Sequence, residues 1–372
     1  MNNSESGKKF LKIFIIYFII LSAFVFVRIA SNFGLFNFDN DIIADLVSTG
    51  IIQIGILFLL PLILYICFFK TSPKKVFKDF GYKKLSAKAI LICFGLGILA
   101  YILNVFVSNF FAIILNYIGY NPQYSYSASS GYDTFPKFLY AVLSVAILPA
   151  ICEEFVHRGL ILRGTSGTIG YKKAIIISSI LFGLMHLNIS QFFYATVLGI
   201  LMGFVASITK SIWPATIIHF CNNFVNVFLS YAESTNLLGF SFTSFLNNVA
   251  GYSVILFFIL SICIITLVLM GVFYLIKKLF MATEAKSYSK KFENIENTIR
   301  DAGGENMTDS EVVMAFEKYI FPNLKSPTNI YDLYINDNKH YGSLELKYKI
   351  SFISCLVLAG LITVFTFIWG VI

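Results

Sequence analysis

Charged side chains are scarce in this chain of 372 residues. They make up 13% of the sequence, whereas hydrophobic residues make up 57%, and the mean hydropathy is +0.77. A soluble globular chain carries about 25% charged and about 45–50% apolar residues. The composition therefore argues against an ordinary soluble domain and predicts a membrane protein.

Cysteines are few, and none stands in a metal-ligand pattern such as C-x-x-C. All six lie in or beside apolar segments: Cys67, Cys93, Cys152, Cys221, Cys263 and Cys355. We expect them to be small buried apolar residues rather than a disulfide framework. The sequence also lacks H-E-x-x-H, which excludes a conventional zinc-protease helix.

A nucleic-acid surface is missing too, although the formal charge is +8 and the pI is about 9.0. Such a surface would interleave basic residues with aromatic residues on which bases stack. The lysines here lie instead in short runs between apolar segments. We therefore expect no nucleic-acid partner, and we expect contact with anionic membrane lipid. The run from Ile13 to Val27 ends without a small-x-small cleavage site, so we expect an uncleaved first span.

Continuous apolar runs occupy most of the chain. A membrane-spanning helix needs about 20 apolar residues, and the runs do not alternate as spanning strands do. We expect nine helices, of which the short fifth and sixth form a tight pair: 10–30, 42–69, 87–117, 137–163, 172–187, 191–209, 213–231, 249–278 and 349–371. Lysine and arginine crowd every second loop, which predicts a multi-pass protein of the cell membrane with its N-terminus in the cytoplasm.

Residues 279–348 break the apolar pattern, because they hold 11 of the 20 acidic residues. No catalytic motif is visible in this segment. We interpret it as a cytoplasmic insert, followed by a C-terminal transmembrane helix at 349–372.

Two adjacent carboxylates interrupt the fourth apolar run, in "ICEEFVHRGL". Outside the insert, the other seven acidic residues lie in tails, loops or span ends, whereas Glu153 and Glu154 lie inside an expected span. Ionisable residues in spans usually mark function. Glu154 and Arg158 share a helix face at the i, i+4 spacing and can pair. Glu153 points about 100° away from Glu154, so it is expected to face something else. His157 is placed four residues after Glu153 and can face it.

Two further histidines lie at apolar helices. His186 stands in "FGLMHLN", and His219 opens "HFCNNF", where Asn223 follows one helical turn later. A carboxylate, imidazoles and an amide from three helices suit hydrolysis by activated water, in which one group removes a proton and others stabilise an oxyanion. Two structural alternatives remain open: Glu154 with Arg158 as an ion pair only, and His219 with Asn223 as an interhelical hydrogen-bonding pair.

These motifs, taken in order, resemble a known family. "EEFVHR" fits E-E-x-x-x-R, "FGLMH" fits F-x-x-x-H, and "HFCNN" fits H-x-x-x-N. Together they resemble the CAAX-protease and bacteriocin-processing family (CPBP or ABI) of intramembrane proteases, which are similar to type II CAAX prenyl endopeptidases. The resemblance implies that Glu153 is the base, that His186 is its partner on the water, and that His219 and Asn223 hold the oxyanion.

The resemblance also implies that Arg158 orients Glu154, which then supports the site. It leaves the mechanism open between a glutamate type without a cofactor and a metal type. In the metal type a divalent ion such as zinc would be bound by Glu153, His186 and His219.

The fold that the resemblance implies is all-α. We expect a protease core of about eight helices at 1–278 with its motif region at 137–231, the cytoplasmic insert at 279–348, and an extra span at 349–372. The expected partners are a peptide or membrane-protein substrate and membrane lipid, while the oligomeric state is left open. Two other classes compete with the endopeptidase: a non-catalytic bacteriocin-immunity or scaffold protein of the same fold, and an ion-coupled transporter that uses Glu153 as a proton carrier.

Overall fold

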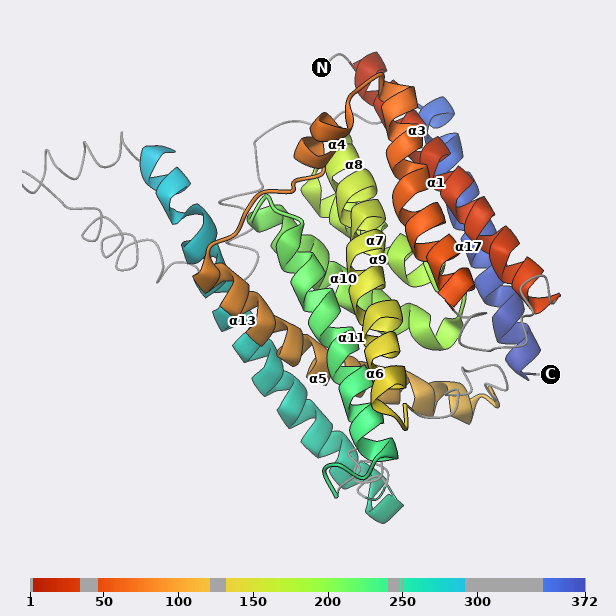
Figure 1. The fold of residues 1–372 in the computed structure, drawn as a ribbon, viewed down its shortest axis with the longest axis vertical. Coiled ribbons are helices and arrows are strands. Elements are labelled where there is room, and N and C mark those ends of the chain that lie inside the picture. Colours follow the sequence, from red (N-terminus) through yellow and green to blue (C-terminus); the bar gives the residue numbers. More distant parts are fainter. Residues whose placement is uncertain are drawn as a thin grey trace, which may run out of the picture.

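The computed structural model is an assembly of helices (Figure 1). It describes residues 3–33, 46–120, 132–239, 248, 251–291 and 344–371, and all regular structure in these ranges is helical. The insert predicted at 279–348 lies mostly outside the described residues, so it stays a prediction. The elements, with π-helical stretches written η, are α1 (Asn3–Asn32), η1 (Gly50–Leu59), α3 (Leu60–Phe69), α4 (Pro73–Asp79), α5 (Ala87–Tyr117), α6 (Phe135–Ala141), η2 (Val142–Ile147), α7 (Leu148–Glu154), η3 (Phe155–Arg163), α8 (Gly164–Ile169), α9 (Tyr171–Met185), α10 (Ile189–Ile208), α11 (Trp213–Ser234), α13 (Val254–Lys291) and α17 (Leu346–Val371).

The predicted all-α membrane architecture is confirmed. Seven helices of the described chain are long and apolar enough to cross a membrane. Helices stand at all nine expected positions, but α9 and α11 do not qualify as spans by themselves. α9 has only 15 residues, and α11 carries His219, Asn222 and Asn223, which lower its hydropathy. α13 continues to Lys291, beyond the expected end of the eighth span, and α17 begins at Leu346.

The first and last helices lie side by side and run in the same direction (Figure 1). The ring of Tyr348 covers Gly7, where a Cβ would clash with it. Further along, Ser351 donates to the carbonyl of Leu11 at 3.3 Å. Since both helices start at the same end of the bundle, the two chain termini lie at opposite ends, as the expected topology requires.

α9 and α10 form the expected tight pair. A Cβ on Gly199 would lie 3.1 Å from Ser179, and one on Gly203 would lie 3.2 Å from Ile175. Small residues let helix backbones approach closely in membranes. The pair packs beside the helix that carries the two glutamates, and α13 packs along α5 on the other side of the bundle (Figure 1).

The basic loops meet at one end of the bundle. The amide of Ile212 donates to the carbonyl of Gly81 at 2.9 Å, and Ser211 donates to the carbonyl of Lys83 at 2.7 Å. Gly81 has a φ of +81° and lies against the guanidinium of Arg163, which leaves no room for a Cβ. The expected second, fourth and sixth loops therefore share one side. That this side is cytoplasmic remains a prediction.

Candidate active site

The helix that carries the two glutamates is interrupted by a proline. Pro149 has no N–H, so it cannot donate to the carbonyl of Val145 one turn earlier. The side-chain amide of Asn223 donates to that oxygen at 2.9 Å. This bond ties α11 to the fourth span just before the glutamates. Directly after Glu154 the helix widens into η3, and such π-helical segments are frequent at functional sites.

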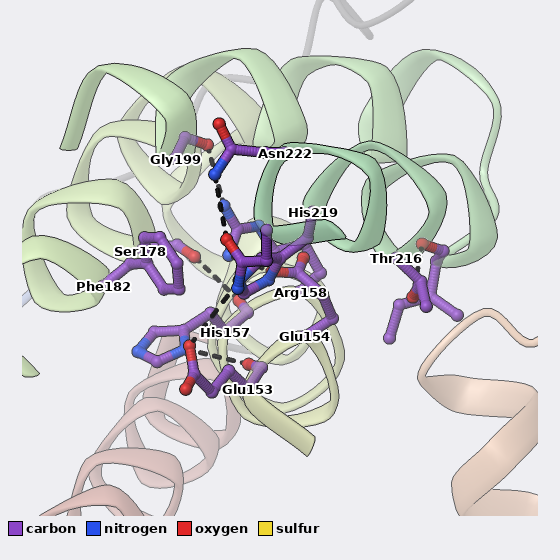
Figure 2. A network of polar contacts seen from close by, with 12 residues as sticks. Glu153, Glu154, His157, Arg158, Ser178, Phe182, Gly199, Thr216, His219 and Asn222 are labelled. Carbon is purple, nitrogen blue, oxygen red and sulfur yellow. Dashed lines mark hydrogen bonds and ion pairs between the residues drawn. The ribbon is translucent and has the colours of Figure 1, made fainter. Parts of the chain in front are cut away.

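Glu154 and Arg158 form the predicted ion pair. The Nη1 atom of Arg158 lies 3.0 Å from Oε1 of Glu154, and both side chains are 0% exposed. The other Nη of Arg158 donates to the carbonyl of Gly199 at 3.1 Å, and the guanidinium lies 4.8 Å from the centre of the Phe182 ring. Figure 2 shows Arg158 and Glu154 lying between the helices. The carboxylate is therefore neutralised inside the protein.

His219 joins the two carboxylates. Its Nδ1 lies 3.0 Å from Oε1 of Glu154, and its Nε2 lies 4.0 Å from Oε2 of Glu153. An ionised carboxylate only accepts hydrogen bonds, so Nδ1 carries the proton. The fixed Nδ1–H orients the ring and turns Nε2 towards Glu153.

Glu153 is the more accessible of the two glutamates. Its side chain is 15% exposed, whereas that of Glu154 is 0% exposed. Its Oε1 accepts a hydrogen bond from Nε2 of Gln53 at 3.2 Å. One carboxylate oxygen is thus held by an amide from η1, while the other faces His219 across a gap that is too long for a direct hydrogen bond.

Phe182 occupies the centre of the cluster. The rings of His157, His186 and His219 stand edge-on to it, with centroids at 5.1, 5.2 and 5.5 Å. His186 joins the cluster through its contact with the Phe182 ring. Its Nδ1 lies 2.9 Å from the main-chain carbonyl oxygen of Phe182. The other ring nitrogen, Nε2, takes no part in this hydrogen bond.

The turn after His186 is strained and braced from outside. Leu187 has a φ of +53°, which is unfavourable for a residue with a branched side chain. The hydroxyl of Thr366 in α17 lies 3.1 Å from the carbonyl oxygen of Leu187 and 2.8 Å from that of Thr363, so its one hydrogen is shared between the two acceptors. The C-terminal helix therefore supports the backbone beside His186.

His157 faces Glu153 through the main chain only. Its Nδ1 lies 2.9 Å from the carbonyl oxygen of Glu153, not from the carboxylate. The ring is buried, and its Nε2 has no hydrogen-bond partner among the described residues. This geometry makes His157 part of the packing around Phe182.

Asn223 belongs to a chain of amides. Asn104 of α5 donates to Asn222 at 3.0 Å, and Asn222 donates to Asn223 at 2.9 Å. Asn223 lies one helical turn beyond His219, as the spacing predicts, and keeps one amide N–H outside these bonds. None of the sequence motifs indicates a role for Asn104, Asn222 or Gln53. The available signal was a polar amide within an apolar span, where such groups usually bond between helices.

The expected metal ligands Glu153, His186 and His219 do not form a ligand cluster. In the described part of the chain no three His, Cys, Asp or Glu side chains are grouped as a metal site would require. The donor groups of the described residues therefore do not fit a bound ion.

Comparison with known proteins finds one family model that is similar to the motif region. No curated protein and no solved structure matches the chain. Residues 135–225, which hold both glutamates, Arg158 and all three site histidines, match a family model described as type II CAAX prenyl endopeptidase Rce1-like. The resemblance seen in the three motifs is thus confirmed: this part of the chain is similar to the Rce1-like family of type II CAAX prenyl endopeptidases.

Proposed function

We propose that the protein is an intramembrane endopeptidase that hydrolyses a peptide bond with activated water. One observation carries the proposal: of two adjacent glutamates, the buried Glu154 is neutralised by Arg158, while Glu153 is partly accessible and held between Gln53 and His219. Two carboxylates in different environments can take different roles.

His219 is placed to act through both ring nitrogens. Its Nδ1 faces Glu154, and its Nε2 points towards Glu153, where the proposed oxyanion would form.

The proposed reaction follows from these positions. A water molecule contacts Oε2 of Glu153, which takes its proton while the water oxygen bonds to the substrate carbonyl carbon. The carbonyl oxygen becomes an oxyanion, stabilised by Nε2–H of His219 and the remaining amide N–H of Asn223. Glu153 then gives the proton to the leaving nitrogen as the C–N bond breaks. Nε2 of His186 serves as a second contact for the water.

The proposed substrate is a membrane-associated protein or peptide. The description of the matching family names prenyl endopeptidases, so a prenylated C-terminal peptide is the first class to test. Leader peptides and small membrane proteins are the next candidates. The protein uses no Ser or Cys nucleophile in this scheme, and no acyl-enzyme forms.

The test compares membrane peptides from cells that express the wild type or Glu153→Gln. We expect a set of cleavage products that disappears in the variant while protein abundance is retained. Glu345→Gln is the matched control, because it makes the same change at a carboxylate that is 63% exposed and pairs with Lys347. If both variants leave the peptides of the wild type unchanged, the endopeptidase proposal is wrong and the non-catalytic alternative gains.

A further inference from the structure

Gln53 reaches the site from a helix outside the segment that matches the family model. It lies in η1, which packs against α7. Its side chain is almost entirely removed from solvent, with 9% of the residue exposed. A polar amide at such a position in an apolar helix needs a partner, and Gln53 finds one in Glu153.

The contact with Glu153 determines the orientation of the amide. A carboxylate accepts hydrogen bonds, so the NH₂ end of Gln53 points to it, with Nε2 at 3.2 Å from Oε1. The carbonyl end of the same planar amide is left beside the carboxylate. This Oε1 is buried and has no hydrogen-bond partner among the described residues. Buried acceptors are nearly always paired in native proteins, so one without a partner at a candidate active site points to a missing donor.

We propose that Gln53 is a substrate-binding residue. Its Nε2 holds the carboxylate of Glu153, and its Oε1 accepts a hydrogen bond from a main-chain N–H of the peptide that is cleaved. This inference rests on the proposed function. A peptide offers N–H donors next to every scissile bond, and an amide side chain can donate to a carboxylate and accept from an N–H at the same time. One residue thereby sets the distance between the base and the substrate backbone.

The first test uses purified protein and a synthetic quenched fluorescent peptide that spans a Glu153-dependent cleavage site. Gln53→Met keeps the length of the side chain and removes the amide. We expect kcat/KM to fall roughly 10- to 100-fold, as for the loss of a hydrogen bond to a charged group. Gln53→Asn, which retains an amide, should recover part of the activity. Asn109→Leu is the control, because among the described residues the amide of Asn109 bonds only the Val105 carbonyl of its own helix.

The second test removes the donor from the substrate. In a series of peptides, each main-chain N–H near the cleavage site is methylated in turn. At one position methylation should lower kcat/KM about tenfold for the wild type and leave Gln53→Met almost unaffected, because the acceptor is already gone. If methylation at every position costs both proteins equally, Oε1 of Gln53 does not bind the substrate backbone.

Failure of the proposed function would be visible separately. If the wild type yields no Glu153-dependent product, the endopeptidase proposal fails, and thermal unfolding of Gln53→Met, Glu153→Met and the double variant tests the contact. A loss of Tm in the double variant that is smaller than the sum of the single losses supports the positioning of Glu153 by Gln53. Additive losses would overturn it.

Discussion

Removal of either member of the buried ion pair should destabilise the protein strongly. Arg158 and Glu154 are both 0% exposed and lie 3.0 Å apart. Arg158→Met leaves the carboxylate of Glu154 inside the protein with His219 as its remaining partner. Breaking a buried pair in this way costs about 3–5 kcal/mol, because the remaining carboxylate loses its guanidinium partner and has no access to solvent.

The other variants of the pair should rank below this change. Glu154→Gln should fall at the lower end of that range, since an amide oxygen can still accept from Arg158 and the guanidinium keeps its bond to Gly199. The doubly neutral Glu154→Gln/Arg158→Met removes both charges, so it should recover a good part of the loss. Replacement of a buried pair by neutral groups of similar size is often nearly neutral.

Glu153→Gln should behave differently, with a loss below about 1 kcal/mol or a small gain. The carboxylate of Glu153 is partly exposed, and a glutamine there can still hydrogen-bond to Gln53. Thermal unfolding of the purified variants in the same detergent would rank their losses of stability. If Glu153→Gln proved more destabilising than Glu154→Gln, the assignment of the base to Glu153 would be reversed.

Three further results are expected. Asn223→Leu should lower the free energy of unfolding by about 1–3 kcal/mol, because the Val145 carbonyl loses the side-chain donor. The loss should be smaller in a Pro149→Ala background, where residue 149 has an N–H that can donate to this carbonyl. Equal losses in both backgrounds, measured by denaturant unfolding, would refute this explanation. Thr366→Val should speed amide hydrogen exchange in the turn after α9. Thr363→Val is the control and should not, because among the described residues the Thr363 hydroxyl bonds only the Ala359 carbonyl of its own helix. Equal exchange rates in the two variants would show that α17 does not support the turn. A reporter fused within 285–340 should signal cytoplasm, and an external signal would overturn the span count.

The sequence by itself determined the class of fold and the local pairing. With 13% charged residues and continuous apolar runs, the chain can satisfy its backbone groups in lipid only as helices. The Glu154–Arg158 contact was predictable for a related reason, since residues four apart share a helix face whatever surrounds them. The three motifs, which lie within short stretches, likewise led to the family that the comparison confirmed over residues 135–225.

Tertiary structure decided which polar groups meet across helices. Gln53 and Glu153 are 100 positions apart, and no periodicity indicates that η1 would face α7. The bond from Asn223 to Val145 depends on α11 passing beside a carbonyl to which Pro149 cannot donate. Nor did the spacing tell which nitrogen of His219 would turn to which carboxylate. Helical repeat is a property of the chain itself, whereas contacts between helices depend on how small residues and large side chains fit together in the folded bundle.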